Sequence, residues 1–182
     1  IFGNNFFTWS NISGVLLSTA VIGILALGTT FVIITAGIDL SIGTGMTLAA
    51  VMTGVFITNM GVPMWLGVIG GVATGALMGL INGLNIAFLK LPPFIATLAM
   101  MMIAQGLALV ISGVRPIYFS TSAPNFKDIA LGTLIPGLPN AVLITGVLAI
   151  IAFFVLGKTL LGRYTFAIGS NEEATRLSGV NT

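Results

Sequence analysis

Five mostly apolar stretches, each roughly as long as a helix that crosses a membrane, restrict what this chain can fold into. A helix needs about 20 predominantly apolar residues to cross the hydrocarbon core of a bilayer. The candidate spans are Ile12–Ala36, Leu40–Met60, Val62–Leu89, Leu91–Gly113 and Ala141–Gly157. The sequence therefore predicts an all-α, polytopic transmembrane helix bundle with about five spans, followed by a short helix in its charged tail.

The composition agrees with a location inside the bilayer. Only 5% of the 182 residues are charged and 57% are hydrophobic, with a mean hydropathy of +1.15. A soluble domain carries about 25% charged residues, which a water-facing surface requires. The low charged fraction makes the lipid bilayer the expected surrounding. The net charge of +2 is too small to indicate nucleic acid as a partner.

The residue inventory excludes several kinds of chemistry. The chain contains neither cysteine nor histidine. Thiol redox chemistry, Cys/His metal sites and histidine acid–base catalysis are therefore excluded, and we expect no metal site and no cofactor bound by this chain. The Walker A pattern of nucleotide-binding loops is also absent from the sequence.

The positive charges predict the orientation, because Lys and Arg are enriched in cytoplasmic loops. They cluster after the fifth span, so residues 158–182 are predicted to be cytoplasmic. Counting back across the spans places the segment 115–140 outside, as either a plain connector or a partly ordered cap or docking surface, and places Asp39 toward the inside. Inside lie Lys90, Lys158, Arg163 and Arg176, and outside lie Arg115 and Lys127.

Residues 1–182 are expected to form a single, partial transmembrane domain. The chain opens at Ile1 without a charged signal-peptide region. It stops at Thr182, directly after a charged segment. An external start also requires an earlier span, so we expect a piece of a longer protein.

A regular glycine pattern marks the third span. The glycines stand at every fourth residue, at Gly67, Gly71, Gly75, Gly79 and Gly83. Such a stripe lets another helix approach backbone to backbone. Static packing is the more frequent use of this pattern, and a moving interface or a pore wall is the alternative.

Few polar side chains interrupt the spans. Gln105 lies near the middle of the fourth span, where it either bonds to a neighbouring helix or contacts a hydroxylated substrate. Asn82 and Asn85 lie near the inner end of the third span, where helix-terminal hydrogen bonding is expected. Gln105 and Asn82 are the candidates for a substrate path. No ionisable residue lies deep in a span, which counts against an ion-coupled transporter.

The stretch TAGIDLSIG holds Asp39, the only acidic residue before Asp128. We expect a helix break here, with Gly37 in the left-handed conformation ending the first span. Asp39 or Ser41 then caps the next helix, and Gly43 closes the break. The alternative is a gating or substrate-path role in a discontinuous helix.

The charged tail predicts a short capped helix over residues 171–178. Ser170 followed by Glu173 has the Ser-x-x-Glu spacing of a capping box. Glu172 and Glu173 lie in the first turn, where the helix dipole favours anions. Gly179 is expected in the left-handed conformation after the last turn. The helix is too short to be stable alone, so it is either a capped loop helix or a docking helix that receives force from another subunit.

Together these stretches resemble a known family, the membrane permease subunits of ribose-type bacterial ABC sugar importers. The matching segments are Asn4–Leu16, Gly28–Ala50, Leu91–Ile117 and Gly162–Thr182. The tail is similar to the coupling-helix motif of these permeases, Glu-Ala-Ala followed by Gly. Here it is Glu173-Ala174-Thr175 and then Gly179, with Thr175 departing from the pattern by one small residue for another.

The resemblance implies a translocation subunit and no enzyme. It implies the N-terminal half of a permease in the bacterial inner membrane, forming the path for a small sugar with a second permease chain in a homo- or heterodimer. An external solute-binding protein would deliver the sugar, and a separate ATP-binding subunit would bind ATP and Mg²⁺. The residues implied to couple to that subunit are Ser170, Asn171, Glu172, Glu173, Ala174, Thr175, Arg176 and Gly179.

Three alternatives remain open from the sequence. A branched-chain amino-acid permease of the same superfamily has a similar glycine-rich break between spans. A secondary transporter would need no nucleotide, and a membrane scaffold would move no substrate. The sequence contains no cluster of polar and aromatic residues that would identify the substrate.

Overall fold

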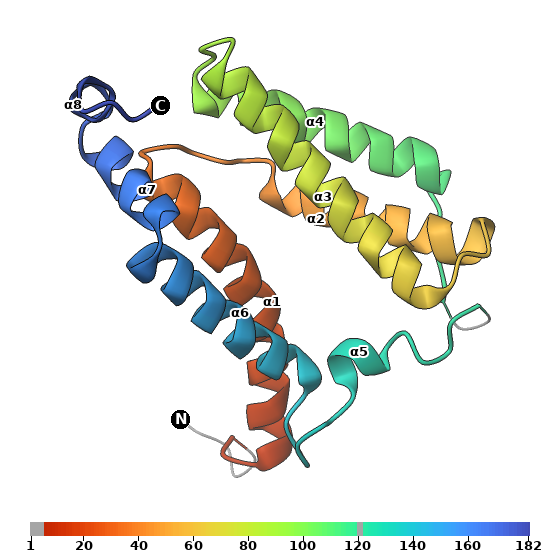
Figure 1. Ribbon diagram of the computed structural model, residues 1–182. Coiled ribbons are helices and arrows are strands. Elements are labelled where there is room, and N and C mark those ends of the chain that lie inside the picture. Colours follow the sequence, from red (N-terminus) through yellow and green to blue (C-terminus); the bar gives the residue numbers. More distant parts are fainter. Residues whose placement is uncertain (1–5, 120–121) are drawn as a thin grey trace. The chain divides into compact units, whose positions relative to one another are not determined.

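The computed structural model describes residues 6–119 and 122–182, which are helical apart from turns and connections (Figure 1). The helices are α1 Trp9–Ile34, α2 Ile42–Gly54 with its π-helical continuation η1 Val55–Asn59, α3 Met64–Ala87, α4 Pro93–Ser112, α5 Asp128–Leu131, α6 Asn140–Lys158, α7 Leu160–Ser170 and α8 Glu172–Leu177. Within the described residues there is no β-strand, and only an isolated bridge joins Ile135 and Leu138. The all-α class is confirmed.

Five of these elements are long and apolar enough to cross a membrane: α1, α2 with η1, α3, α4 and α6. The predicted number of spans is therefore confirmed. The predicted and observed span boundaries differ by three residues at most. This largest difference is at the start of the first span, which was predicted at Ile12 and lies at Trp9. α4 begins at Pro93, where the missing N–H of proline costs no hydrogen bond.

The described residues form two compact units. Unit 1 comes from the ranges Ile1–Ala36 and Lys127–Thr182, and unit 2 comes from Gly37–Phe126. The chain thus passes from unit 1 into unit 2 directly after α1 and returns before α5. Each unit has its own contacts between helices.

Unit 1 is built on α1 and α6, which run side by side in the same direction (Figure 1). Trp9 Nε1 donates to the carbonyl of Gly137, just before α6, at 3.1 Å. Further along, the Thr145 hydroxyl of α6 donates to the Ala20 carbonyl of α1 at 3.2 Å. A parallel first and fifth span is what alternating membrane crossings require, so this contact supports the five-span topology.

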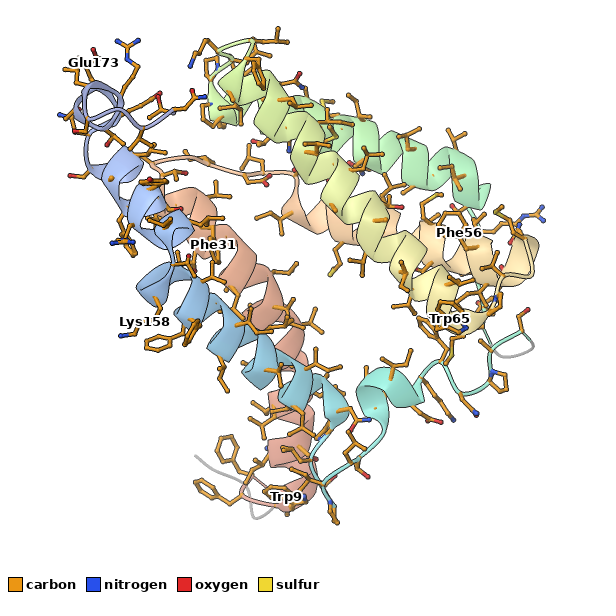
Figure 2. All side chains as sticks on the ribbon, in the orientation of Figure 1. Trp9, Phe31, Phe56, Trp65, Lys158 and Glu173 are labelled. Atoms are coloured by element: carbon orange, nitrogen blue, oxygen red, sulfur yellow. The ribbon has the colours of Figure 1, made fainter. Side chains whose placement is uncertain are left out.

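The opposite ends of unit 1 carry different structures. Trp9 and Glu173 lie at the two ends of the unit (Figure 2). At the Trp9 end, Asn140 accepts the Leu134 N–H at 2.9 Å and donates to the Asp128 carbonyl at 3.0 Å, which fixes the chain between α5 and α6. These bonds order residues 128–140, and the external position of the segment 115–140 stays a prediction.

Unit 2 contains an antiparallel pair, α2 and α3, joined by a short turn at Gly61 (Figure 1). Asn82 near the end of α3 bonds to Ser41 before α2 at 3.1 Å. Near the other end, Gly71 of α3 lies against Thr53 of α2. These two contacts fix the register of the pair over almost its whole length.

The predicted glycine stripe has two different parts in the structure. A Cβ added to Gly71 would lie 2.9 Å from the carbonyl oxygen of Ala49, and one added to Gly67 would collide with Ile57. These two glycines therefore seat α3 on α2, as static packing predicts. The other three have open space within 4 Å in the described residues, at Gly75, Gly79 and Gly83.

The core of unit 2 lies where α2, α3 and α4 meet. Its buried members are Leu48, Met78, Met100, Ala104 and Ala108. Small residues on α4 again allow close approach, while the flexible methionines fill the remaining space. Of the three consecutive methionines on α4, Met100 is buried and Met102 is exposed, so the run is divided between core and surface.

We predict that Gly71→Ala destabilises the folded protein by about 1–3 kcal/mol, because the added methyl group meets the Ala49 backbone, which cannot move aside. Gly79→Ala is the matched control, since its Cβ meets nothing and alanine favours the helix. Equilibrium unfolding by SDS in mixed micelles measures both. Equal midpoints for the two variants would contradict the packing role of Gly71.

Candidate functional site

The break between the first two spans differs from the prediction by one residue. Ala36, and not Gly37, takes the left-handed conformation, with φ of 59°. α1 ends at Ile34 with Thr35 as its C-cap, so the left-handed position after the cap falls on Ala36. The prediction for Gly37 was wrong because the helix ends two residues earlier than the apolar run.

Asp39 organises the residue that precedes α2. Its Oδ1 accepts the backbone N–H of Ser41 at 2.7 Å and the Ser41 hydroxyl at 2.6 Å. Ser41 is the N-cap of α2, yet its side chain makes no capping bond to that helix. The expected side-chain cap is therefore absent. Instead, the Asp39 carboxylate forms a local turn with Ser41, and the Ser41 side chain makes no bond to the first turn of α2.

The Ser41 hydroxyl continues this polar chain into α3. Because it donates its proton to Asp39, its lone pairs are free to accept, and Asn82 Nδ2 donates to it at 3.1 Å. Asn82 is only 5% exposed, and its Oδ1 has no hydrogen-bond partner in the described residues. The helix-terminal bond expected for Asn82 is thus a bond to the start of another helix.

α4 reaches the same region through Thr97. The Thr97 hydroxyl, which is buried, lies 3.2 Å from the Ile38 carbonyl and 2.8 Å from the Pro93 carbonyl. The segment before α2 is therefore held by polar groups from α3 and α4. Buried and mutually bonded groups of this kind fix the helices relative to one another within unit 2.

Gln105 and Gly43 take no part in this network. Gln105 is exposed on α4, and its side chain makes no hydrogen bond within the described part of the chain. Gly43 lies in the first turn of α2, and a Cβ there would meet nothing within 4 Å. The structure therefore does not join the two candidates for the substrate path, Gln105 and Asn82, by any hydrogen bond among the described residues.

The tail forms α8, with its N-cap one residue later than predicted. Asn171 has the extended backbone of an N-cap and accepts the Ala174 N–H at 2.9 Å through Oδ1. Ser170 is instead the last residue of α7, so its assignment as the N-cap was wrong. Serine and asparagine cap helices about equally well, and the fold selects between them. Gly179 has φ of +87°, which confirms the predicted left-handed end.

α8 has a buried side and an exposed side. Thr175 is buried, and its hydroxyl donates to the Asn171 carbonyl at 2.7 Å. On the exposed side, Arg176 pairs with Glu173 at 2.7 Å, and Leu177 is 79% exposed. An exposed ion pair adds little to the stability of a helix.

The sequence reasoning missed α7, the helix between the last span and α8. Its N-cap, Thr159, accepts the Gly162 N–H at 3.3 Å and donates to the Val155 carbonyl at 2.6 Å. Threonine is a favoured N-cap, and that was the available signal. Arg163 and the nearby glycines lowered the apolar content and concealed the helix.

Comparison with known proteins assigns the class. Residues 11–182 match the family described as branched-chain amino acid transport system / permease component. The chain belongs to this permease family, and it is a multi-pass membrane protein like the bacterial inner-membrane permeases it resembles. The family's members are components of transport systems and are not themselves catalytic.

Several curated relatives are sugar permeases. The chain is 38% identical to the ribose import permease protein of Escherichia coli (strain K12), over 97% of this chain and 55% of that relative. It is 38% identical to the fructose import permease protein of Rhizobium meliloti, over 100% and 52%, and to the L-arabinose transport system permease protein of Escherichia coli (strain K12), over 99% and 54%. These matches confirm the resemblance inferred from the sequence.

The chain spans about half the length of the curated relatives it matches. No solved structure matches it.

We predict that Asp39→Asn retains most of the assembly and transport of the permease, because an amide oxygen can still accept both Ser41 bonds. Asp39→Ala leaves two donors of the buried Ser41 unpaired and costs about 1–3 kcal/mol of folding stability. Unfolding midpoints and uptake in vesicles measure both variants. Loss of transport by a normally folded Asp39→Asn protein would contradict this structural role and favour a gating role.

We predict that Asn171→Ala weakens α8 by about 1 kcal/mol, since the Ala174 N–H loses its side-chain acceptor. Ser170→Ala is the matched control and leaves α8 unchanged, because Ser170 does not cap it. Hydrogen exchange of the amides in residues 172–179 measures both. Faster exchange in Ser170→Ala than in Asn171→Ala would restore the original assignment.

Proposed function

We propose that this chain is the N-terminal half of the membrane permease of an ATP-driven importer of a small sugar. In this proposal two permease chains form the path through the inner membrane. An external solute-binding protein delivers the sugar, and ATP is hydrolysed on separate subunits at the cytoplasmic side. Residues 158–182 are cytoplasmic and receive the movement of those subunits through α8.

The exposed side of α8 is the observation that carries this proposal. A helix of six residues is too short to persist without support, yet this one is capped by Asn171 and has Thr175 buried on one side. It presents a charged pair next to the exposed apolar side chain of Leu177. In this proposal Leu177 supplies the apolar centre of the contact with the partner and the charged pair supplies its polar rim.

The distribution of charge supports nucleotide-driven transport over ion coupling. Ion- and proton-coupled transporters carry ionisable residues near the middle of the membrane. In the described parts of the five spans, the only Asp, Glu, Lys or Arg is Lys158, the last residue of α6. For this half of the permease, the distribution counts against ion coupling and favours a partner that hydrolyses ATP.

A sugar is the favoured substrate because the relatives named above import ribose, fructose and L-arabinose. The family description favours a second candidate, a branched-chain amino acid. Uptake of labelled ribose and labelled leucine by vesicles that contain the full-length permease and its partners distinguishes them. Uptake of leucine alone would replace the sugar by the second candidate.

We predict that Glu173→Lys weakens association of the full-length permease with its ATPase about tenfold or more. The substitution reverses the charge at the centre of the exposed side of α8 and removes the ion pair with Arg176. Pull-down and substrate-stimulated ATP hydrolysis measure the effect. Lys127→Glu, an exposed charge reversal in the segment before α6, is the control. Association and stimulated hydrolysis both unchanged in Glu173→Lys would refute the docking role.

A further inference from the structure

α7, the helix that precedes α8, contacts the end of the first span through backbone atoms. Gly169, the last but one residue of α7, lies against the end of α1. A Cβ added there would collide with the Ile34 carbonyl oxygen and would lie 3.3 Å from the Thr35 Cα. These obstructing atoms belong to the backbone, so no side chain of α1 can turn aside to make room.

The other end of α7 is equally tight. A Cβ added to Gly162 would lie 2.6 Å from the Leu156 Cα, in the last turns of α6. Gly162 is buried, and its N–H is held by Thr159 at 3.3 Å. The corner between α6 and α7 is therefore closed by backbone contact and by the Thr159 side chain, which bonds to both helices.

α7 also continues directly into α8. The Asn171 N–H donates to the Ala167 carbonyl of α7 at 3.0 Å. The Asn171 carbonyl then accepts the N–H of Thr175 at 3.0 Å and its hydroxyl at 2.7 Å. One residue thus ends α7 and begins α8, and hydrogen bonds join the two helices through it.

We propose that Gly169 is a positioning residue that transmits movement of α8 to the C-terminal end of α1. The inference rests on the proposed docking function of α8. Contact between two backbones passes on a small displacement, because close-packed backbone atoms cannot rearrange as side chains do. α1 then moves with α8, and the chain enters unit 2 at Gly37, three residues after Ile34.

The test compares alanine variants of the full-length permease, reconstituted with its ATPase and binding protein. We expect Gly169→Ala to bind the ATPase as the wild type does but to move about tenfold less substrate per ATP hydrolysed, a loss typical of coupling between two sites. Gly28→Ala on α1 and Gly157→Ala on α6 are matched controls with open space at the Cβ, and both should equal the wild type.

A ratio of uptake to hydrolysis in Gly169→Ala equal to the wild type would overturn the transmission role while leaving the docking role of α8 intact. ATP-driven uptake by the wild type, measured in the same vesicles, tests the proposed function separately. The ratio also distinguishes transmission from simple packing, because a merely less stable protein loses uptake and stimulated hydrolysis in proportion.

A second measurement does not require Gly169→Ala to fold. These 182 residues contain no cysteine, so in a full-length permease whose other cysteines are replaced, spin labels can be placed on α1 and α8 through Ile33→Cys and Ser178→Cys, both exposed positions. If α8 and the end of α1 move together, the distance between the labels is the same with and without trapped ATP. A change larger than the width of the nucleotide-free distance distribution would overturn the proposal.

Discussion

Hydrocarbon supplies no hydrogen bonds to a backbone, and the rest of this structure depends on that constraint. Every membrane-spanning segment must pair its own N–H and carbonyl groups, so each is a helix. Lipid is as apolar as leucine, so burial of apolar side chains does not hold the helices together. Close approach does, and it requires small residues. Gly71 against Ala49 and Gly169 against Ile34 are two places where backbones meet directly.

The same constraint decides where polar side chains are found. Hydroxyl groups within the spans mostly bond to their own helix, as Thr29 does to the Leu25 carbonyl at 2.8 Å. Among the described residues, side-chain bonds between different elements are few, and one of them joins Ser41, which Asp39 holds in place, to Asn82 of α3. It lies where α2 begins, at the edge of the apolar segment. Charged groups are thereby confined to helix ends, where they can fix turns or meet soluble partners.

The sequence was sufficient for the spans, because hydropathy over some 20 residues averages out local ambiguity. It was insufficient where the exact residue at a helix end had to be chosen between two neighbours. Ser170 and Asn171 are adjacent and both cap well, and only the backbone of the folded chain shows that Asn171 is the cap. Gly37 was the better candidate for a left-handed residue, but the helix ended early and Ala36 took the position. The partner of Asn82 depends on the register of α2 and α3, which no local pattern contains.

The charged tail shows that residues of one short sequence motif can have different structural roles. Thr175 occupies the position where the family pattern has alanine, and the structure places it on the buried side of α8. A small residue is needed there, and the extra hydroxyl is accommodated because it donates to the Asn171 carbonyl. Glu173 belongs to the same short motif but points to solvent with Arg176. Within three residues the motif therefore combines an internal packing requirement with an external surface. The first holds the helix in place, and only the second can recognise a partner.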